Sequence, residues 1–439
     1  MPRHAMPWLL LLLAIPARLL AQADAEVARA TAAIAPLLVE LRHDLHRNPE
    51  LSNRETRTAG VVERELRRLG LEVRTGIART GVVGVLKGGR PGPVVGVRAD
   101  MDALPVTEAT DVPYRSQATT EYLGRTVGVS HACGHDIHVA AALGVAEVLA
   151  GMRQKLAGTV VFVFQPAEEG APPGETGGAQ VMVEEGFLRD YRPQVMLALH
   201  ADGAPPDEAG DTEVTGVVGW RAGPMAASST SWRARVIGRQ AHGAYPHVGV
   251  DAIVTGAQVV EALQTIRSRT VDPTAGAVVT VGIFRAGDRN NVVAGEAQLA
   301  GTIRTFDDSL TTVIRARMTA IFDGITRAAG ASYELEFYHW NPVTANDTTL
   351  ARRLAPVLER VVGQGNVRQA TLGMGAEDFA YFSREVPSFY YTIGAVNPGN
   401  VSGGHHTPTF RADDEAIPVG VRTMAALVLH ALATTPPPR

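Results

Sequence analysis

The feature that constrains this chain most is a set of short apolar runs, each about one strand long. Runs that are apolar at every position are typical of strands buried on both faces of a sheet. A segment rich in Ala and Leu, Val139 to Leu156, lies between two of them and reads as a helix. The alternation predicts an α/β fold with a mixed, largely parallel sheet covered by helices. The runs are Val82 to Leu86, Val94 to Val97, Thr159 to Phe164 and Val195 to Leu199.

The middle of the chain follows a different order of elements: strand, helix, strand, strand, helix, strand. This is the order of a small ferredoxin-like α+β domain. Since the first pattern returns after Pro342, we predict a larger domain in two pieces, 24–213 and 341–439, interrupted by an inserted domain at 214–340. The predicted elements of the insertion are Thr230 to Ile237, Asp251 to Ser268, Val278 to Phe284, Ala297 to Thr305, Ser309 to Ala329 and Ser332 to Tyr338.

The N-terminus has the pattern of a cleaved export signal. An apolar run from Trp8 to Ile15 follows Arg3 and His4, and Ala21-Gln22-Ala23 is a small-residue cleavage pattern. A membrane anchor is the alternative, but the run is well short of the ~20 residues that span a bilayer. We therefore expect residues 1–23 to be removed as a signal peptide. The mature protein is expected to be secreted or periplasmic, without stable membrane insertion.

Size and charge narrow the class of protein. A chain of 439 residues exceeds the size at which one hydrophobic core keeps growing, which agrees with two domains. The net charge of -4, with arginines scattered along the chain, offers no basic field for nucleic acid. Export would place Cys133, the single cysteine, in an oxidising compartment without a partner in the chain. It is either a small buried hydrophobe or a metal ligand.

The residues around Cys133 favour the metal ligand. The segment His131-Ala132-Cys133-Gly134-His135-Asp136-Ile137-His138 contains a thiol, three imidazoles and a carboxylate. Thiolate and imidazole bind soft or borderline cations, and a nearby carboxylate can orient a ring. Burying so many polar groups for structural reasons alone would need many partners. We predict a metal site here, in which not every one of these side chains need be a ligand.

Other polar residues follow the predicted strands. Glu168 and Glu169 belong to Gln165-Pro166-Ala167-Glu168-Glu169-Gly170, which follows the apolar strand Thr159 to Phe164. One of them can therefore bind a metal while the other acts as general base; a solvated acidic turn is the alternative. Asp100 and His200 also end strands, which would bring them to the same rim. His405 or His406 could add a late ligand.

Two positions in the inserted domain are weaker candidates. His242 lies in a loop rich in Gly and Pro after a strand, where it could stabilise charge on a reacting oxygen. Asn291 stands in a segment that on its own reads as a plain turn.

Taken together, the motifs resemble those of the two-metal amidohydrolases and exopeptidases, which include aminoacylases, glutamate-releasing carboxypeptidases, hippurate hydrolases and auxin-conjugate (IAA-amino acid) hydrolases. The hippurate and auxin-conjugate branch is the closest, because it too has Cys-Gly-His where other branches have a bridging aspartate. The resemblance covers nearly the whole mature chain. Its motifs are RADMDALP, HACGHDIHVA, QPAEEG, AHGAYPHVGVDA, NVVAGEAQLAGTIRTF, MGAEDFAYF and HHTPTF.

The resemblance implies a role for each matching residue. Glu168 matches the general base, Asp100 the aspartate that orients a metal-site group, and His242 the histidine that polarises the scissile carbonyl, often across a dimer interface. Asn291 and Arg304 fall in motifs that help hold the substrate. The inserted domain would be a lid and dimerisation domain, and the protein a homodimer. The implied ligands of two divalent metal ions, whether Zn, Mn, Co or Ni, are Cys133, His135, Glu169, His200 and His406, the last preferred over His405 for its spacing to Pro408.

The implied activity is metal-dependent hydrolysis of the amide bond of small N-acyl or N-aroyl amino acids. A dipeptidase or aminopeptidase, and a periplasmic protein that binds peptide or metal without turnover, are the alternatives. One departure from the family pattern is the segment Ala171 to Gly177, which is longer than the compact form and could reshape the pocket mouth.

Overall fold

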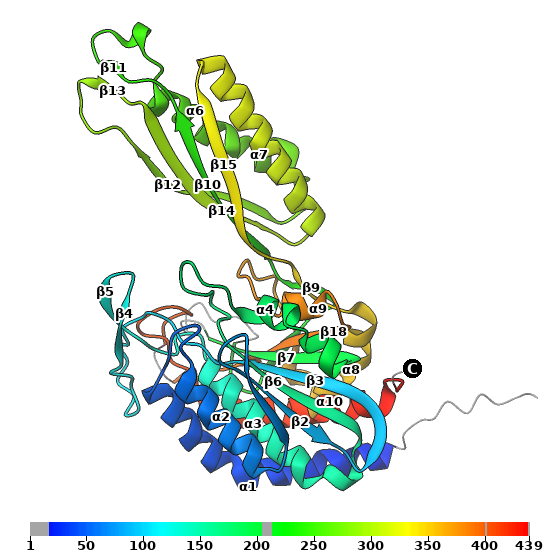
Figure 1. The fold of residues 1–439 in the computed structure, drawn as a ribbon. Helices are drawn as coiled ribbons and strands as arrows, with labels where there is room; N and C mark the ends of the chain where they lie inside the picture. Colours follow the sequence, from blue (N-terminus) through cyan, green and yellow to red (C-terminus); the bar gives the residue numbers. More distant parts are fainter. Residues whose placement is uncertain (1–16, 204–212, 400–401, 438–439) are drawn as a thin grey trace, which may run out of the picture.

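The chain folds into a large domain with a smaller, elongated domain standing on it (Figure 1). The computed structural model describes residues 17–203, 213–399 and 402–437. The predicted signal peptide therefore lies outside the described residues up to position 16.

The large domain is built on an eight-stranded sheet in the order β1-β2-β6-β3-β7-β18-β8-β17. Neighbours within β6-β3-β7-β18 are parallel, while β1-β2, β2-β6 and β18-β8 are antiparallel. The strands are β1 (Glu72–Ile77), β2 (Gly81–Lys87), β3 (Arg90–Asp100), β6 (Ala157–Gln165), β7 (Val195–Asp202), β8 (Val218–Trp220), β17 (Val367–Gln369) and β18 (Ser388–Gly394). The predicted mixed, largely parallel α/β sheet is confirmed.

Helices cover both faces of this sheet, so its central strands are buried on both sides, as their continuous apolar sequences predict. One face carries α1 (Ala17–Arg47), α2 (Thr56–Arg68), α3 (His135–Gly151), α8 (Thr348–Val362) and α10 (Ala416–Thr434). The other carries α4 (Gly178–Glu184), α5 (Phe187–Tyr191) and α9 (Ala380–Ser383).

Among the described residues, α10 alone is long and apolar enough to cross a membrane by length and composition. However, 72% of its apolar window is buried inside the large domain. Its apolarity is thus explained by packing in the core against α1, α3 and α8.

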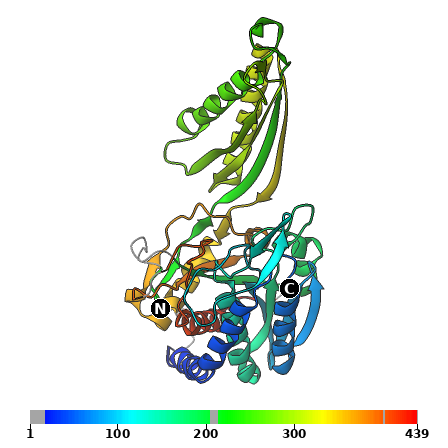
Figure 2. The same ribbon diagram turned by 90° about the vertical axis from the view of Figure 1, so that its left-hand side faces the viewer.

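The small domain is a four-stranded antiparallel sheet in the order β12-β14-β10-β15, with both of its long helices on one face (Figure 2). Its apolar core lies between sheet and helices and includes Trp232, Val259 and Phe322. The elements are β10 (Ser228–Ile237), α6 (Ala252–Thr265), β12 (Ala277–Ala286), β14 (Glu296–Thr305), α7 (Asp308–Ala329) and β15 (Ser332–Asn341), and a two-stranded piece is formed by β11 (Ala241–His242) and β13 (Val292–Val293).

Some boundaries differ from the predicted ones. The stretch 214–226, assigned above to the insertion, supplies β8 to the large sheet and β9 (Gly223–Ala226), which pairs with β16 (Thr344–Asn346) in the second piece of the large domain. The small domain therefore begins at β10. Helix α3 begins at His135 rather than Val139, and a hairpin of β4 (Thr119–Tyr122) and β5 (Arg125–Gly128) precedes it.

Candidate metal centre

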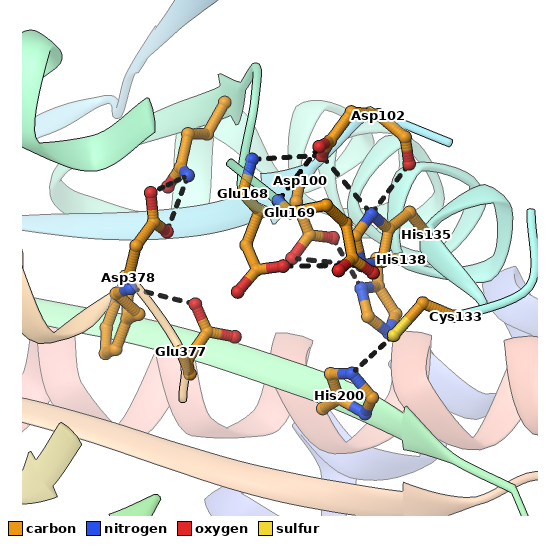
Figure 3. A network of polar contacts seen from close by, with 12 residues as sticks. Asp100, Asp102, Cys133, His135, His138, Glu168, Glu169, His200, Glu377 and Asp378 are labelled. Atoms are coloured by element: carbon orange, nitrogen blue, oxygen red, sulfur yellow. Dashed lines mark hydrogen bonds and ion pairs between the residues drawn. The ribbon is translucent and has the colours of Figure 1, made fainter. Parts of the chain in front are cut away.

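The predicted ligands from the first piece of the large domain meet at one edge of its sheet. Asp100 ends β3, Glu168 and Glu169 follow β6, and His200 lies near the end of β7. Because β3, β6 and β7 are parallel, their carboxyl ends share this edge. The segment before α3 adds Cys133 to the same edge (Figure 3).

Local backbone geometry explains the Cys-Gly-His sequence. Gly134 has φ of +86°, a left-handed conformation that a residue with a side chain rarely adopts. This turn caps α3, so that Cys133 and His135 both reach the site from adjacent positions. Cys133 is buried and unpaired by any disulfide.

The donor atoms of these side chains converge. Ligand atoms of Cys133, His135 and Glu169 lie within 4.8 Å of one another, and so do those of Cys133, His200 and His405. Cys133 belongs to both groups, and its Sγ lies 3.6 Å from His200 Nε2. A thiolate shared between two ligand groups fits a pair of borderline cations.

Two of the histidines are held by one ring nitrogen and present the other to the site. His135 Nδ1 donates to the carbonyl oxygen of Asp102 at 2.8 Å, and His200 Nδ1 lies 3.1 Å from Asp202 Oδ1. His135 Nε2 is buried without a hydrogen-bond partner, 4.0 Å from carboxylate oxygens of Glu168 and Glu169. Outer-shell anchoring of this kind is typical of metal-binding histidines. The residues therefore fit a metal, which would satisfy the unpartnered nitrogen.

The electrostatics of the cluster favour a thiolate. Burial is the largest influence on Cys133 and opposes its ionisation, but the surrounding histidines, His405 first, hold the pKa of the thiol well below its usual range. Burial, with Cys133 alongside, raises the pKa of Glu169 to about 7. Burial, followed by the charge of Glu377, raises the pKa of Glu168 well above its ordinary value. Cations in the site would oppose both carboxyl shifts.

Both histidines near the C-terminal end of the chain, His405 and His406, reach the cluster. His406 Nε2 lies 3.1 Å from Glu169 Oε1, while His405 groups with Cys133 and His200. His405 Nε2 accepts the Gly203 N–H at 2.9 Å, which leaves only its Nδ1 for a metal. His406 has φ of +63°, a strained backbone of the kind that gathers at functional sites. The contact with Glu169 and the spacing to Pro408 favour His406. The grouping with Cys133 and His200, together with a buried and unpartnered Nδ1, favours His405. Both histidines therefore remain candidate ligands.

The third imidazole of the motif is not free to bind a metal. His138 Nδ1 donates to Asp100 Oδ1 at 2.6 Å, and its Nε2 accepts the Ala201 N–H at 2.7 Å. Asp100, which also pairs with Arg98 at 2.7 Å, therefore orients His138, and His138 supports the strand residue next to His200.

Asp102 contacts more of the site than Asp100 does, although the sequence analysis did not single it out. Its carboxylate accepts the backbone N–H groups of Glu168 at 3.1 Å and Glu169 at 3.0 Å (Figure 3). Its carbonyl holds His135. The sequence feature that could have identified Asp102 is its position two residues after Asp100 in the motif RADMDALP.

A buried charge cluster borders Glu168 and was also missed. Arg98 pairs with Glu377 at 2.9 Å and with Asp378 at 3.0 Å, and all three side chains are buried. A ligand atom of each acid lies within 4.8 Å of one from Glu168. Residues 377 and 378 stand in the quoted motif MGAEDFAYF, but nothing in the sequence places them beside a glutamate about two hundred positions earlier.

The candidates in the small domain do not join this cluster. His242 and Asn291 are exposed and adjacent, since β11 pairs with β13 and the Gly243 N–H donates to the Asn291 carbonyl. Figure 1 places β11 at the end of the small domain remote from the large domain. Arg304 lies at the opposite end of β14, close to the junction, where it pairs in register with Ser229. No acidic side chain in the described part of the chain pairs with Arg304, and burial lowers its pKa.

Thiolate, imidazole and carboxylate donors at one edge of the large sheet, in a chain with an inserted small domain, are the features of a metal-dependent hydrolase. The comparisons with known proteins give the family: residues 96–430 match the model of Peptidase family M20/M25/M40. The chain belongs to this family. The predicted family resemblance and enzyme class are confirmed.

Relatives named for their activity are amide-bond hydrolases. The chain is 32% identical over 398 residues to an N-acetylcysteine deacetylase of Bacillus subtilis, covering 90% of this chain and 97% of the relative. It is 32% identical over 397 residues to IAA-amino acid hydrolase ILR1-like 2 of Arabidopsis thaliana, covering 90% and 85%. A dinuclear metal-binding M20 peptidase of Bacillus subtilis has a similar structure, with TM-score 0.76 and 31% identity over 92% of this chain and 99% of that one. The chain is accordingly a metallo-amidohydrolase with a candidate two-metal site.

Proposed function

We propose that the protein hydrolyses the amide bond of N-acyl or N-aroyl amino acids and releases the free amino acid. The observation that carries the proposal is that Cys133 lies in two groups of metal donors, one with His135 and Glu169 and one with His200 and His405. His406 reaches the same site through Glu169. Glu168 lies 4.0 Å from His135 Nε2 and forms a neighbouring acidic group with Glu377 and Asp378. A base next to the donors, on an edge that substrate can reach, is what amide hydrolysis requires.

Glu168 is the proposed general base. When bound, two divalent cations supply Lewis acidity, which lowers the pKa of water and polarises a carbonyl oxygen. Glu168 takes the proton of the attacking water and returns it to the leaving nitrogen. Asp102 holds the Glu168 backbone, while Glu169 contributes its carboxylate to the ligand set.

Arg304 is the proposed partner of the substrate carboxylate. The Arg304 guanidinium is half-buried, and no acidic side chain among the described residues pairs with it, so its hydrogen-bonding fork is available for a carboxylate. Asn291 and His242 are proposed to act as a pair, with Asn291 holding substrate and His242 stabilising negative charge on the carbonyl oxygen.

Because His242 is remote from Glu168 within one chain, we propose a homodimer in which the small domain of one subunit completes the site of the other. The small domain offers an edge strand for such contact: β12 is at the edge of its sheet and exposes Ile283 and Phe284. Tyr245 and Val248, beside His242, are 58% and 55% exposed. An exposed apolar edge strand is typical of an association surface.

The geometry favours N-acyl substrates over substrates with a free amine. A dipeptidase would need an acidic group free to hold the amine. Glu377 and Asp378 lie near Glu168, but their oxygens accept bonds from Arg98, Gln165, Tyr390 and backbone N–H groups. These acids are therefore occupied within the fold.

A hydrolysis screen tests the proposal. Metal-stripped protein and protein restored with Zn, Mn, Co or Ni are offered benzoyl- and acetyl-amino acids and free dipeptides, and amino acid release is measured. We expect turnover of the acylated compounds only after metal is restored. Faster cleavage of free dipeptides would replace the proposal with a dipeptidase.

Export is the remaining proposal, and it rests on the N-terminal sequence pattern. Cleavage after Ala23 would leave α1 beginning at Asp24, whose carboxylate pairs with Arg360. N-terminal sequencing of protein recovered outside the cytoplasm should begin at Asp24, and an intact N-terminus would contradict the predicted signal peptide.

A further inference from the structure

One fully buried carboxylate near the site has no part in the mechanism above. Glu55 lies between α1 and α2 and its exposed fraction is 0%. A buried carboxylate is unfavourable unless its oxygens are hydrogen-bonded. The partners of Glu55 therefore indicate why it is there.

Those partners lead to residues 166–170, the catalytic loop, which carries Glu168 and Glu169. Glu55 Oε1 accepts the N–H of Ala167 at 2.9 Å and that of Asn53 at 3.0 Å. Its Oε2 accepts the hydroxyl of Thr80 at 2.6 Å. Ala167 directly precedes Glu168 and has φ of +53°, a conformation that costs energy for a residue with a side chain.

Glu55 and Asp102 together hold three consecutive backbone amides. Asp102 accepts the N–H groups of Glu168 and Glu169, and Glu55 accepts that of Ala167. Ser52, three residues before Glu55, donates its hydroxyl to Asp102 at 2.7 Å, which ties the two carboxylates to one segment. Two fixed acceptors on neighbouring peptide planes set the direction in which the side chains of Glu168 and Glu169 leave the loop.

The same segment also anchors the extra length after the catalytic loop. Asn53 Nδ2 donates to Glu175 at 3.0 Å, and Arg54 pairs with Glu175 at 2.6 Å. Glu175 belongs to Ala171 to Gly177, the stretch that departs from the compact family form. Residues 52–55 and Asp102 thus hold both the catalytic loop, from Ala167, and the longer stretch that follows it, as far as Glu175.

We propose that Glu55 is a positioning residue, which fixes the general base Glu168 and the ligand Glu169 by accepting the Ala167 N–H. The proposal rests on the function proposed above. Outer-shell partners of metal sites typically change affinity or activity about 10- to 100-fold when lost, and small displacements of a catalytic group have effects of similar size.

Three substitutions separate hydrogen bonding from charge. Glu55→Gln keeps a carbonyl oxygen for the Ala167 N–H, and its amide can donate to Thr80. Glu55→Met has similar length and accepts no such bond. Glu55→Asp keeps the charge, but its side chain is one methylene shorter, so its oxygens lie farther from the Ala167 N–H. If Glu55→Met fails to fold, Glu55→Asp still tests the proposal. Glu50→Met is the matched control, because the Glu50 carboxylate caps α2 through the N–H groups of Arg57 and Thr58 and does not contact the catalytic loop.

Two readouts are measured on the metal-loaded full chain: kcat and KM on the best N-acyl amino acid, and amide hydrogen exchange at residues 167–169. In Glu55→Met and Glu55→Asp we expect kcat to fall about 10- to 100-fold with little change in KM, and exchange at these amides to accelerate. Glu55→Gln should stay within about threefold of wild type, since one acceptor remains. Glu50→Met should lower Tm but leave kcat and the exchange at 167–169 unchanged.

Wild-type kcat and exchange in Glu55→Asp or Glu55→Met would overturn the proposal. So would a loss in Glu55→Gln as large as in Glu55→Met, or an equal loss in Glu50→Met. If the wild-type protein hydrolyses no N-acyl amino acid, the proposed function fails, while the exchange experiment still tests whether Glu55 holds the loop.

Discussion

The two domains differ in what they bury. Within the described residues, the buried polar side chains of the small domain are all hydroxyls, such as Ser228, Thr305 and Thr326. The large domain also buries hydroxyl and amide side chains, but in addition it buries charged and titratable ones, most of which surround the candidate metal centre: Arg42, His46, Glu55, Arg98, Asp100, Asp102, His131, His135, Asp136, His138, Glu377 and Asp378.

This difference indicates that the large domain carries the groups that bind metal and transfer protons. A hydroxyl can be satisfied by a neighbouring carbonyl, whereas a buried charge is costly unless it is paired or binds a metal. The small domain is therefore a stable apolar scaffold, which presents His242, Asn291 and Arg304 at its surface. The large domain buries carboxylates close to one another, and bound cations would reduce the repulsion between them.

The largest effect is expected from Glu168→Gln, which removes the base and retains the shape. Turnover should fall by about 100-fold to 10,000-fold, because proton transfer is lost. Metal content, measured by elemental analysis, should stay at the wild-type level. The neighbouring substitution Glu169→Gln is the matched control and should reduce metal content as well. Near-normal turnover in Glu168→Gln would refute its assignment.

His242→Ala tests whether the small domain enters the chemistry at all. We expect a loss of about 100-fold or more in kcat, the size of a lost oxyanion donor, with metal content unchanged. His247→Ala, an exposed histidine in the same loop, should have little effect.

Mixing the two inactive variants tests the shared site. If the small domain of one subunit serves the other, heterodimers of Glu168→Gln and His242→Ala contain one intact site and regain activity. Continued inactivity after subunit exchange would contradict the proposed dimeric site and would place His242 in the site of its own subunit.

Arg304→Ala should change binding more than chemistry. Loss of a charge-assisted hydrogen bond to the substrate carboxylate should raise KM by about 10-fold or more, with a smaller change in kcat. Arg233 lies on the same helix-free face of the sheet and pairs with Glu336, so Arg233→Ala is the control. Equal effects of both substitutions on KM would indicate a general electrostatic influence rather than a carboxylate site.

The smallest effect concerns stability against pH without metal. Burial raises the pKa of Glu169 from 4.5 to about 7, so the unfolded state releases this proton first as pH rises. The metal-free protein should therefore lose stability as pH rises from 4.5 to about 7, by at most about 3 kcal/mol from this group. Thermal unfolding should show a smaller decline in metal-free Glu169→Gln and in the metal-loaded wild type. Equal pH dependence in all three would contradict this account.

Much of the fold could be predicted because local patterns specify it. Continuous apolar runs indicated β2, β3, β6 and β7, and the order of elements indicated the inserted domain. The prediction missed β18, an interior strand of the large sheet, although Ser388–Gly394 is buried at every position, as the predicted central strands are. Its place between β7 and β8 depends on contacts with segments far away in the sequence. It also assigned β8 to the wrong side of the boundary, since a strand of three residues carries too little pattern.

The candidate site, like the fold, could be predicted from the sequence only in part. Sequence by itself determined the kinds of donor and their motifs, because thiolate, imidazole and carboxylate bind cations whatever fold carries them. Only the tertiary structure decided that His138 is occupied by Asp100 and Ala201, that Asp102 and Glu55 hold the catalytic loop, and that His242 stands far from Glu168. These are relations between distant segments, and they depend on distances that no local pattern encodes.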